Sequence, residues 1–180
     1  CLNVIDGKIQ QEPDSLPAPG AKPVFDSRPP NVPEGALLQH FKGLEIKAAQ
    51  PCFSPDTAIL MDFRCDQSRG IHFIYLLPYS PTEALVESTM LSPKRQNDEF
   101  YAEAIKTYLE TYWATGGWQV NHTEQGCIPM AFVQPANPDY LPIGANGGCV
   151  RPSSGYAFTF IQKHTAVSYT HLTLPTTGSV

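Results

Sequence analysis

Proline constrains this chain more than any other residue. The 180-residue sequence contains 18 prolines, about twice the share of roughly 5% that is usual in proteins. Proline lacks a backbone N–H and clashes with the preceding helical turn, so prolines spread along a chain exclude long helices from most of it. We therefore expect short strands and irregular connections to dominate the fold.

One proline-poor stretch carries a strong helical pattern. It follows Asn97-Asp98, a pair suited to capping a helix N-terminus, and it ends at Gly116-Gly117, which suit the left-handed conformation at a helix C-terminus. Its apolar residues recur with a period of about 3.6 residues; they are Phe100, Tyr101, Ala104, Ile105, Tyr108, Leu109, Tyr112 and Trp113. This stripe predicts an amphipathic helix that covers a sheet.

Several runs are typical of strands because they are β-branched, aromatic or alternately apolar. The turn signal Tyr79-Ser80-Pro81 joins two of them into a predicted hairpin. The runs are residues 2–5, 22–25, 37–49, 57–63, 71–77, 83–90, 118–123 and 126–133. Together with the helix they predict an α+β fold, a mostly antiparallel sheet with one long covering helix, rather than a doubly wound sheet.

Composition excludes several classes of function. The net charge of −5 gives no basic face for nucleic acid. Neither the five cysteines nor the five histidines show metal-ligand spacing, so we expect no metal. The odd cysteine count fits a reducing cytosol, and no run of about 18 apolar residues exists to span a bilayer.

The predicted hairpin carries one carboxylate among apolar and aromatic residues. Side chains alternate along a strand, so Glu87 shares a face with Leu85 and Thr89, while Val86 and Ser88 point to the other face. Burial raises the pKa of a carboxyl group and makes it a usable general acid. The alternative is that Glu87 is a solvated strand residue or an ion-pair partner.

A glycine-rich run near the end of the chain is the second candidate site. It spans residues 144–158 and contains Gly147-Gly148 and Ser153. Glycines allow close approach of backbone to a ligand, and a helix that begins near Ser153 would direct free amides at an anionic or electron-rich cofactor. The alternative is an ordinary turn that leads into a helix.

Taken in order, these segments resemble the bacterial lycopene β-cyclases, flavoproteins of the glutathione-reductase superfamily. The resemblance covers roughly residues 24–165, and the hairpin and the Arg151-Pro152-Ser153-Ser154-Gly155-Tyr156 run make it specific. Supporting pieces are Val24 to Pro29, Gln39 to Glu45, Leu60 to Phe63 and Glu124 to Met130. The resemblance implies a redox-neutral, acid-catalysed cyclisation of lycopene ends to β-rings, giving γ- and β-carotene, for which reduced FAD is required.

The resemblance also implies roles for individual residues. The glutamate of the family's Leu-(Val/Ile)-Glu-x-Thr strand has the acid/base role, and it corresponds to Glu87; Asp62 in the Met-Asp-Phe run is a second acidic candidate. Tyr75 and Tyr79 are candidate partners of the cation, with core or rim packing as the alternative. The family's flavin-lining segment corresponds to Gly147, Gly148, Pro152, Ser153, Gly155 and Tyr156.

Two departures from the family set the predicted domain limits. The strand, G-x-G-x-x-G turn and helix that hold the FAD pyrophosphate are not present, and residues 168–177 do not continue the expected final helix. We therefore expect residues 1–30 to be a remnant of an FAD-binding domain, 31–134 the substrate-binding sheet and helix, 135–166 a return to the FAD-binding domain, and 167–180 a non-native tail. The isolated chain is expected neither to retain FAD tightly nor to cyclise lycopene.

Two alternative functions stay open at this point. One is a flavin-dependent hydroxylase or isoprenoid reductase of the same superfamily, which would not need Glu87. The other is a non-catalytic isoprenoid-binding fragment. Because lycopene lies in membranes, the full enzyme is expected in the cytoplasm, peripheral at the cytoplasmic membrane.

Overall fold

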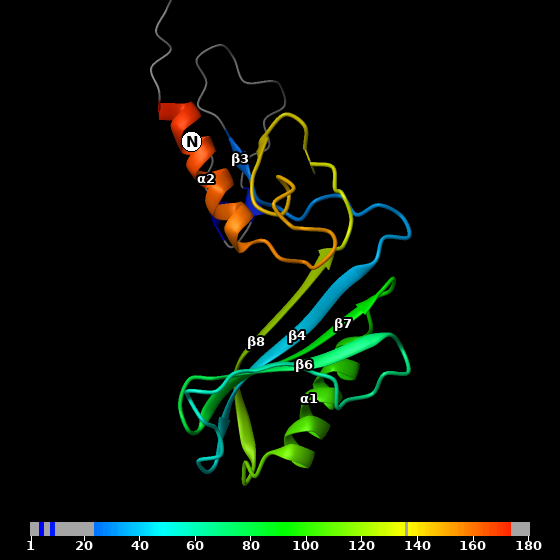
Figure 1. The fold of residues 1–180 in the computed structure, drawn as a ribbon, viewed down its shortest axis with the longest axis vertical. Helices are drawn as coiled ribbons and strands as arrows, with labels where there is room; N and C mark the ends of the chain where they lie inside the picture. The colour runs from blue at the N-terminus through cyan, green and yellow to red at the C-terminus, as the bar shows by residue number, and fades with distance from the viewer. Residues whose placement is uncertain (1–3, 6–7, 10–23, 136, 174–180) are drawn as a thin grey trace, which may run out of the picture. The chain divides into compact units, whose positions relative to one another are not determined.

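The computed structural model describes residues 4–5, 8–9, 24–135 and 137–173. The chain divides into two compact units (Figure 1). Residues Gly35–Pro129 form one, called here the sheet unit; Cys1–Glu34 and Met130–Val180 form the other, called here the loop–helix unit. The sequence predicted divisions near residues 30 and 134.

The sheet unit is a five-stranded antiparallel sheet with one helix along it (Figure 1). The strand order is β5-β6-β7-β4-β8, and every neighbouring pair is antiparallel. The strands are β4 (Leu38–Ala48), β5 (Ile59–Asp62), β6 (Ile71–Pro78), β7 (Glu83–Ser92) and β8 (Trp118–Pro129), and the helix is α1 (Asp98–Tyr112). The predicted α+β class and the β6–β7 hairpin are confirmed.

Helix α1 begins where the sequence predicted and ends earlier. The Asn97 side chain accepts a hydrogen bond from the Phe100 amide, which satisfies one of the free N–H groups of the first turn. The helix ends at Tyr112 rather than at Gly116-Gly117, because Trp113 takes an extended backbone and packs its ring 5.3 Å from that of Phe53. The two glycines form the turn into β8, both with positive φ.

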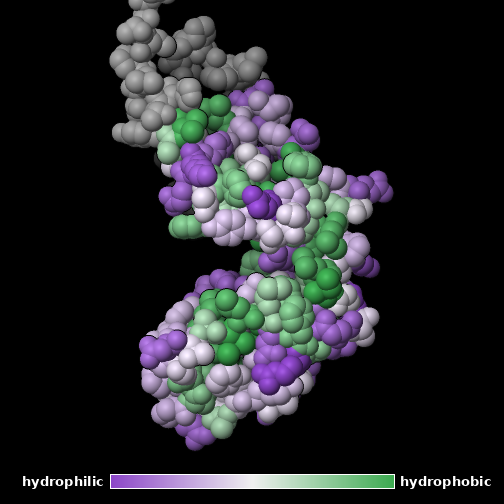
Figure 2. Space-filling view, viewed as in Figure 1, coloured by the Kyte–Doolittle hydropathy of each residue, from purple (hydrophilic) through white to green (hydrophobic). Residues whose placement is uncertain are grey.

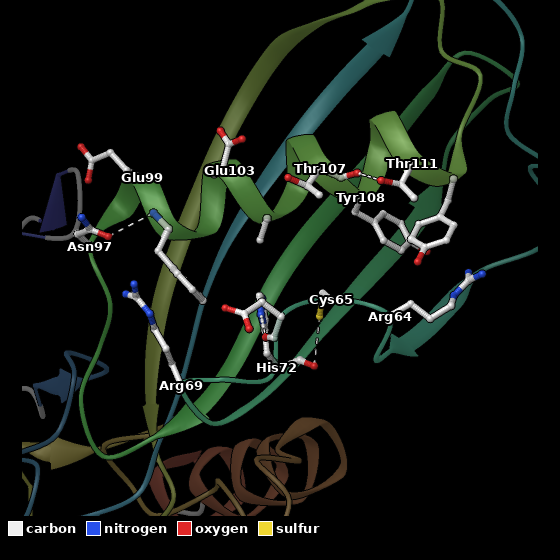
Figure 3. Close-up of a pocket in the computed structure, with 14 residues that line it drawn as sticks. Arg64, Cys65, Arg69, His72, Asn97, Glu99, Glu103, Thr107, Tyr108 and Thr111 are labelled. Carbon is white, nitrogen blue, oxygen red and sulfur yellow. Dashed lines mark hydrogen bonds between the residues drawn. The ribbon is translucent and has the colours of Figure 1, made fainter.

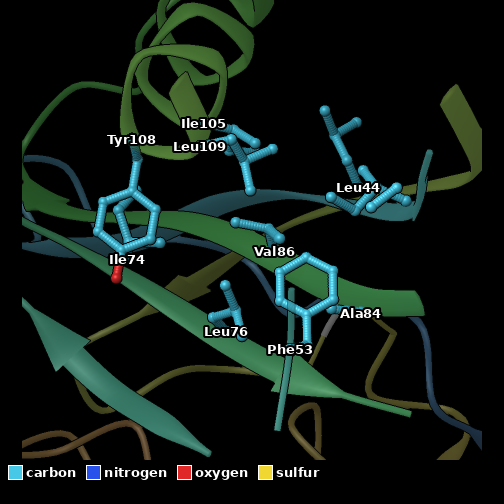
Figure 4. Packing of buried hydrophobic residues seen from close by; sticks show 11 residues of the cluster. Leu44, Phe53, Ile74, Leu76, Ala84, Val86, Ile105, Tyr108 and Leu109 are labelled. Atoms are coloured by element: carbon cyan, nitrogen blue, oxygen red, sulfur yellow. The ribbon is translucent and has the colours of Figure 1, made fainter. Parts of the chain in front are cut away.

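The core lies between α1 and one face of the sheet, as the helical stripe predicted. Ile105, Tyr108 and Leu109 from α1 are buried against strand residues (Figure 4). The strand residues in this cluster are Leu44, Ile46, Ala48, Ile74, Leu76, Ala84 and Val86, joined by Phe53. The β4, β6 and β7 residues that alternate with this set project from the opposite face of the sheet.

Strand β8 differs from the prediction. The sequence predicted two strands, residues 118–123 and 126–133, but a single strand runs from Trp118 to Pro129. Gly126 lies opposite Phe41 of β4, and a Cβ at Gly126 would lie 2.5 Å from the Phe41 ring. Glycine is present there because the Phe41 ring occupies the space above the strand.

The loop–helix unit contains little regular structure. Strand β1 (Val4–Ile5) pairs with β2 (Lys8–Ile9), and β3 (Phe25–Asp26) pairs in parallel with β9 (Leu141–Pro142). The predicted proline-rich stretch up to residue 20 and the start of the predicted strand 22–25 lie outside the described residues.

The last helix, α2 (Phe158–Thr173), corrects two expectations. It begins at Phe158 and not near Ser153, because residues 151–156 close into a turn in which the Arg151 amide donates to the Tyr156 carbonyl oxygen. It also continues to Thr173, so the expected end of the helix near residue 167 is wrong.

Candidate active site

Glu87 lies on the face of the sheet that points away from α1. We call this face the distal face. Cross-strand register places Tyr75 of β6, Glu87 of β7, Gly43 of β4 and Glu124 of β8 in one row across it. The neighbouring rows of the distal face, from the same register, contain Phe73, Thr89, Phe41 and Gly126 on one side and Leu77, Leu85, Glu45 and His122 on the other.

The surroundings of Glu87 favour its protonated form. The side chain is half-buried, and burial is the main cause that raises the pKa of its carboxyl group; the negative charge of Glu124 raises the pKa further. A hydrogen bond donated by the Thr89 hydroxyl opposes these effects in part. Within the described residues no cation forms a salt bridge with Glu87, which disfavours the ion-pair alternative.

Aromatic rings flank this carboxyl group. The ring of Tyr75, directly across from Glu87, packs edge-on to Phe73 with centroids 5.2 Å apart, and Phe73 packs in turn against Phe63 at 5.6 Å. Burial and the neighbouring Glu87 charge raise the pKa of Tyr75, so this phenol keeps its proton. Tyr79 is 57% exposed beyond the end of β6. Of the two predicted tyrosines, Tyr75 is the one beside the acid.

Asp62, the second acidic candidate, lies on the other side of the sheet. It pairs with Ile74, a residue of the core beneath α1. Arg64 donates to both carboxylate oxygens, with its Nη2 2.6 Å from Oδ2, and the Tyr108 hydroxyl donates to Oδ2 at 2.7 Å. The Arg64 hydrogen bonds hold the pKa of Asp62 well below its usual range. These contacts keep Asp62 ionised, whereas burial raises the pKa of Glu87.

A cavity of about 530 Å³ lies between α1 and the loop after β5 (Figure 3). It is lined by residues of both, including Arg64, Arg69, Phe100 and Tyr108. His72, at its inner wall, is buried and engaged by the Ser88 hydroxyl and the Asp66 carbonyl oxygen. The sequence did not predict this cavity, and the sheet separates it from Glu87.

Some apolar side chains of the sheet unit are exposed to solvent. Leu60, Phe63 and Ile71, from β5, the loop after it and β6, are each about half exposed or more. Hydrophobic surface is visible in green between polar areas in Figure 2.

The predicted flavin-lining residues lie in one continuous loop between β9 and α2. Gly148 and Gly155 have φ of 74° and 70°, a left-handed conformation that favours glycine. A Cβ at Gly147 would lie 2.7 Å from the Pro142 carbonyl oxygen and 2.8 Å from His164 Cε1, so this loop packs closely against α2. In the adjoining turn, Ser153 and Tyr156 are exposed and Pro152 is half-buried.

Asp26 and Asn146 hold this loop to β3. The buried Asp26 carboxylate accepts hydrogen bonds from the backbone amide and guanidinium of Arg28, and these hold its pKa below the usual range. The Asn146 amide donates to the Asp26 carbonyl oxygen. The segment 24–29, part of the family resemblance, therefore positions the glycine loop.

Two features are absent from the part of the chain that the structure describes. It contains no group of three or more His, Cys, Asp or Glu side chains placed to hold a metal ion. None of its helices is both long enough and apolar enough to cross a membrane.

Comparison with solved structures defines the class of fold. The chain is similar to a geranylgeranyl bacteriochlorophyll reductase-like protein from Thermoplasma acidophilum, with a TM-score of 0.52 and 11% identity over 81% of this chain and 38% of that one. The chain thus shares the fold of part of that protein.

Comparison of sequences identifies the family. The profile of the family described as lycopene cyclase protein matches residues 17–173, and the chain belongs to this family. It is 30% identical to the lycopene β-cyclase of Paracoccus sp. (strain N81106 / MBIC 01143), over 68% of this chain and 33% of that protein. It is also 30% identical to that of Pantoea ananas, over 77% of this chain and 38% of that protein. The chain spans about a third of the length of these relatives.

Proposed function

We propose that this chain is part of a lycopene β-cyclase, a flavin-dependent enzyme of carotenoid biosynthesis that closes β-rings at the ends of lycopene. The observation that carries the proposal is the half-buried Glu87, whose pKa is raised, on an aromatic-lined face of the sheet. Family membership supports the choice of substrate. The sheet unit supplies the substrate-binding part of the site.

Glu87 starts the proposed reaction as an acid. Its carboxyl O–H gives the proton to the terminal carbon–carbon double bond of lycopene, and a tertiary cation forms. An internal double bond attacks this cation, and loss of a neighbouring proton leaves the ring double bond. An unactivated alkene is a weak base, so the donor must be protonated when the substrate arrives, and burial of Glu87 favours this state.

The other residues of the distal face protect the cation. Leu77 and Leu85 are apolar neighbours in the adjoining row and help to exclude water, which would otherwise capture the cation. The half-buried rings of Tyr75 and Phe41 offer a negative aromatic face to a positive charge, and the buried Phe73 holds Tyr75 in place. These rings are already packed in place, so they need not rearrange when the cation forms.

The glycine loop is the proposed flavin contact. FAD in its reduced form would supply a negative, electron-rich ring system that stabilises a cation without net electron transfer. Gly147, Gly148, Pro152, Ser153, Gly155 and Tyr156 would lie along it. The space beside Gly148 is open, because a Cβ there would meet no atom within 4 Å, and the Tyr156 ring is about half exposed, so both residues are accessible to a ligand.

The substrate also suggests where the enzyme works. Lycopene is a hydrocarbon of the bilayer, so we propose a cytoplasmic enzyme that is peripheral at the cytoplasmic membrane. The exposed apolar side chains Leu60, Phe63 and Ile71 support contact with such a hydrophobic phase.

Replacement of Glu87 by Gln in a full-length cyclase carrying this segment tests the proposal. The variant keeps the size of the side chain and removes its proton, so ring formation in a lycopene-accumulating host should stop while bound flavin is retained. The matched control is Glu83→Gln, on the same strand and face but paired with Lys47 at the rim, which should leave ring formation unchanged. A Glu87→Gln enzyme that still makes β-carotene at the wild-type rate would overturn the proposal and favour a reductase or hydroxylase, which does not need this acid.

A further inference from the structure

The distal face carries a second carboxylate in the row of Glu87. Glu124 of β8 lies two strands from Glu87, with Gly43 of β4 between them. No local pattern in the sequence connects these two glutamates, which lie 37 positions apart (124 − 87). Their relation depends on the register of three strands.

The Glu124 side chain leans across β4 toward β7. An ideal Cβ at Gly43 would lie 2.9 Å from Glu124 Cγ, 3.0 Å from its Oε1 and 3.0 Å from Leu85 Cδ1. The Glu124 side chain from β8 and the Leu85 side chain from β7 therefore share the space above Gly43. A residue larger than glycine at position 43 would push Glu124 away from Glu87.

The two carboxyl groups also interact electrostatically. The charge of Glu124 contributes to the raised pKa of Glu87, and it raises the pKa of Tyr79 as well. The two groups differ in exposure, since Glu87 is half-buried and Glu124 is exposed. An exposed side chain can exchange protons directly with water, whereas burial favours the protonated form of Glu87.

Ring closure needs a base as well as an acid. We propose that Glu124 is the base that removes the proton lost when the ring closes, while Glu87 gives the proton that starts the reaction. This inference rests on the proposed cyclase function and adds a second catalytic residue to it.

The proposed steps balance in atoms and electrons. The Glu87 O–H bond breaks and a C–H bond forms at the terminal alkene. The electron pair of the internal alkene forms the ring C–C bond, and a C–H bond beside the new cation then breaks. Its electron pair becomes the ring double bond and its proton goes to the Glu124 carboxylate. Glu124 releases this proton to water, and Glu87 takes one from water, so no net proton is consumed.

The spacing of the two groups suits this division of roles. Two interstrand spacings of about 4.8 Å separate their Cα atoms by roughly 10 Å, and the inclined Glu124 side chain shortens the gap between carboxyl groups. Inverting glycosidases, which also divide the acid and base roles between two carboxyl groups, keep those groups roughly 6.5–9.5 Å apart, with a water molecule in the gap. A six-membered ring forming above Leu85 and Gly43 would thus lie between donor and acceptor.

The first test is product analysis of Glu124→Gln in a full-length cyclase carrying this segment. We expect β-ring formation to fall by about 100-fold or more, as is usual when a general base is lost. The residual products should shift toward rings with a displaced double bond or an added hydroxyl group, because the cation still forms but loses its proton elsewhere or captures water. Glu124→Asp should recover part of the β-ring yield. Glu103→Gln, an exposed glutamate of α1 on the other side of the sheet, is the control and should behave as wild type.

The second test measures the carboxyl groups without catalysis. Titration of labelled glutamate side chains by NMR in the 180-residue chain should show a lower Glu87 pKa in Glu124→Gln than in wild type, because the Glu124 charge is one cause that raises it. Gly43→Ala keeps both carboxyl groups but displaces Glu124, and it should shift the Glu87 pKa in the same direction.

The outcomes separate the two proposals. If Glu87→Gln remains active, the cyclase mechanism itself is wrong. If Glu87→Gln is inactive while Glu124→Gln matches wild type in rate, products and pH profile, the cyclase proposal stands and the role of Glu124 is refuted. An unchanged Glu87 pKa in both Glu124→Gln and Gly43→Ala would refute the coupling between the two groups.

Discussion

Replacement of Asp62 by Asn tests whether this aspartate holds the fold or serves the chemistry. Its side chain is 9% exposed, and it accepts hydrogen bonds from the buried Tyr108 and from Arg64, which is 60% exposed. A hydrogen bond to a charged group contributes about 1.5–3 kcal/mol, whereas an ion pair with an exposed partner contributes about 0–1 kcal/mol. We therefore expect Asp62→Asn to lower the free energy of unfolding by about 2 kcal/mol near neutral pH, with most of the loss arising at Tyr108.

Urea denaturation of the 180-residue chain, followed by far-ultraviolet circular dichroism, measures this loss. Tyr108→Phe should cost about 1–2 kcal/mol, and the double variant should cost less than the sum, because both single changes remove the same hydrogen bond. Asp66→Asn is the control in the same loop. Among the described residues, the hydrogen bonds to the Asp66 carboxylate come from Ser68, two positions away. This variant should change the free energy of unfolding by less than about 0.5 kcal/mol.

The pH dependence of the free energy of unfolding tests the contribution of Asp62 independently. Arg64 lowers the pKa of Asp62 in the folded state, so its contribution is complete above the unfolded value of about 3.9 and is lost as pH falls below it. Wild type should lose stability below about pH 4 more steeply than Asp62→Asn. Equal stability of Asp62→Asn and wild type, or strictly additive effects of the two single changes, would refute the structural role.

Three further predictions follow from the same structure. Burial lowers the pKa of His40 and His72. Unfolding lets both imidazoles take up protons, so the chain should be less stable to urea near pH 5 than near pH 7. A stability that does not change between these pH values would contradict this, and His72→Gln should make the change smaller. Leu109→Ala, at a fully buried core position, should cost about 2–5 kcal/mol in urea denaturation, whereas Val120→Ala at an exposed position of β8 should cost less than about 0.5 kcal/mol. The purified 180-residue chain should show no flavin absorbance after dialysis, and flavin that stays with it would refute the expectation that tight FAD binding needs a nucleotide-binding unit.

Local patterns predicted the parts of the fold that depend on near neighbours. The stripe from Phe100 to Trp113 predicted α1 and the side that it buries, and strand alternation predicted the face shared by Leu85 and Glu87. These succeed because helical and strand periodicity place side chains on a face without reference to the rest of the chain.

The failures depend on contacts between distant residues. The sequence predicted two strands, 118–123 and 126–133, where β8 is a single strand that pairs along β4; Gly126 lies against Phe41, which is 85 positions earlier (126 − 41). Asp62 accepts a hydrogen bond from Tyr108, which lies on α1. Glu124 approaches Glu87 only because β4 pairs with both β7 and β8. Register and long-range packing decide all three, and no local pattern contains them.

The state of the Glu87 carboxyl group tests the central claim most directly. Its pKa can be measured by NMR titration of labelled glutamate in the 180-residue chain, with Glu87→Gln to assign the signal. A value above that of an ordinary glutamate, about 4.3, is the predicted result, because burial and the Glu124 charge both favour the proton. A value at or below the ordinary one would mean that Glu87 is a solvated carboxylate and not an acid poised for an alkene.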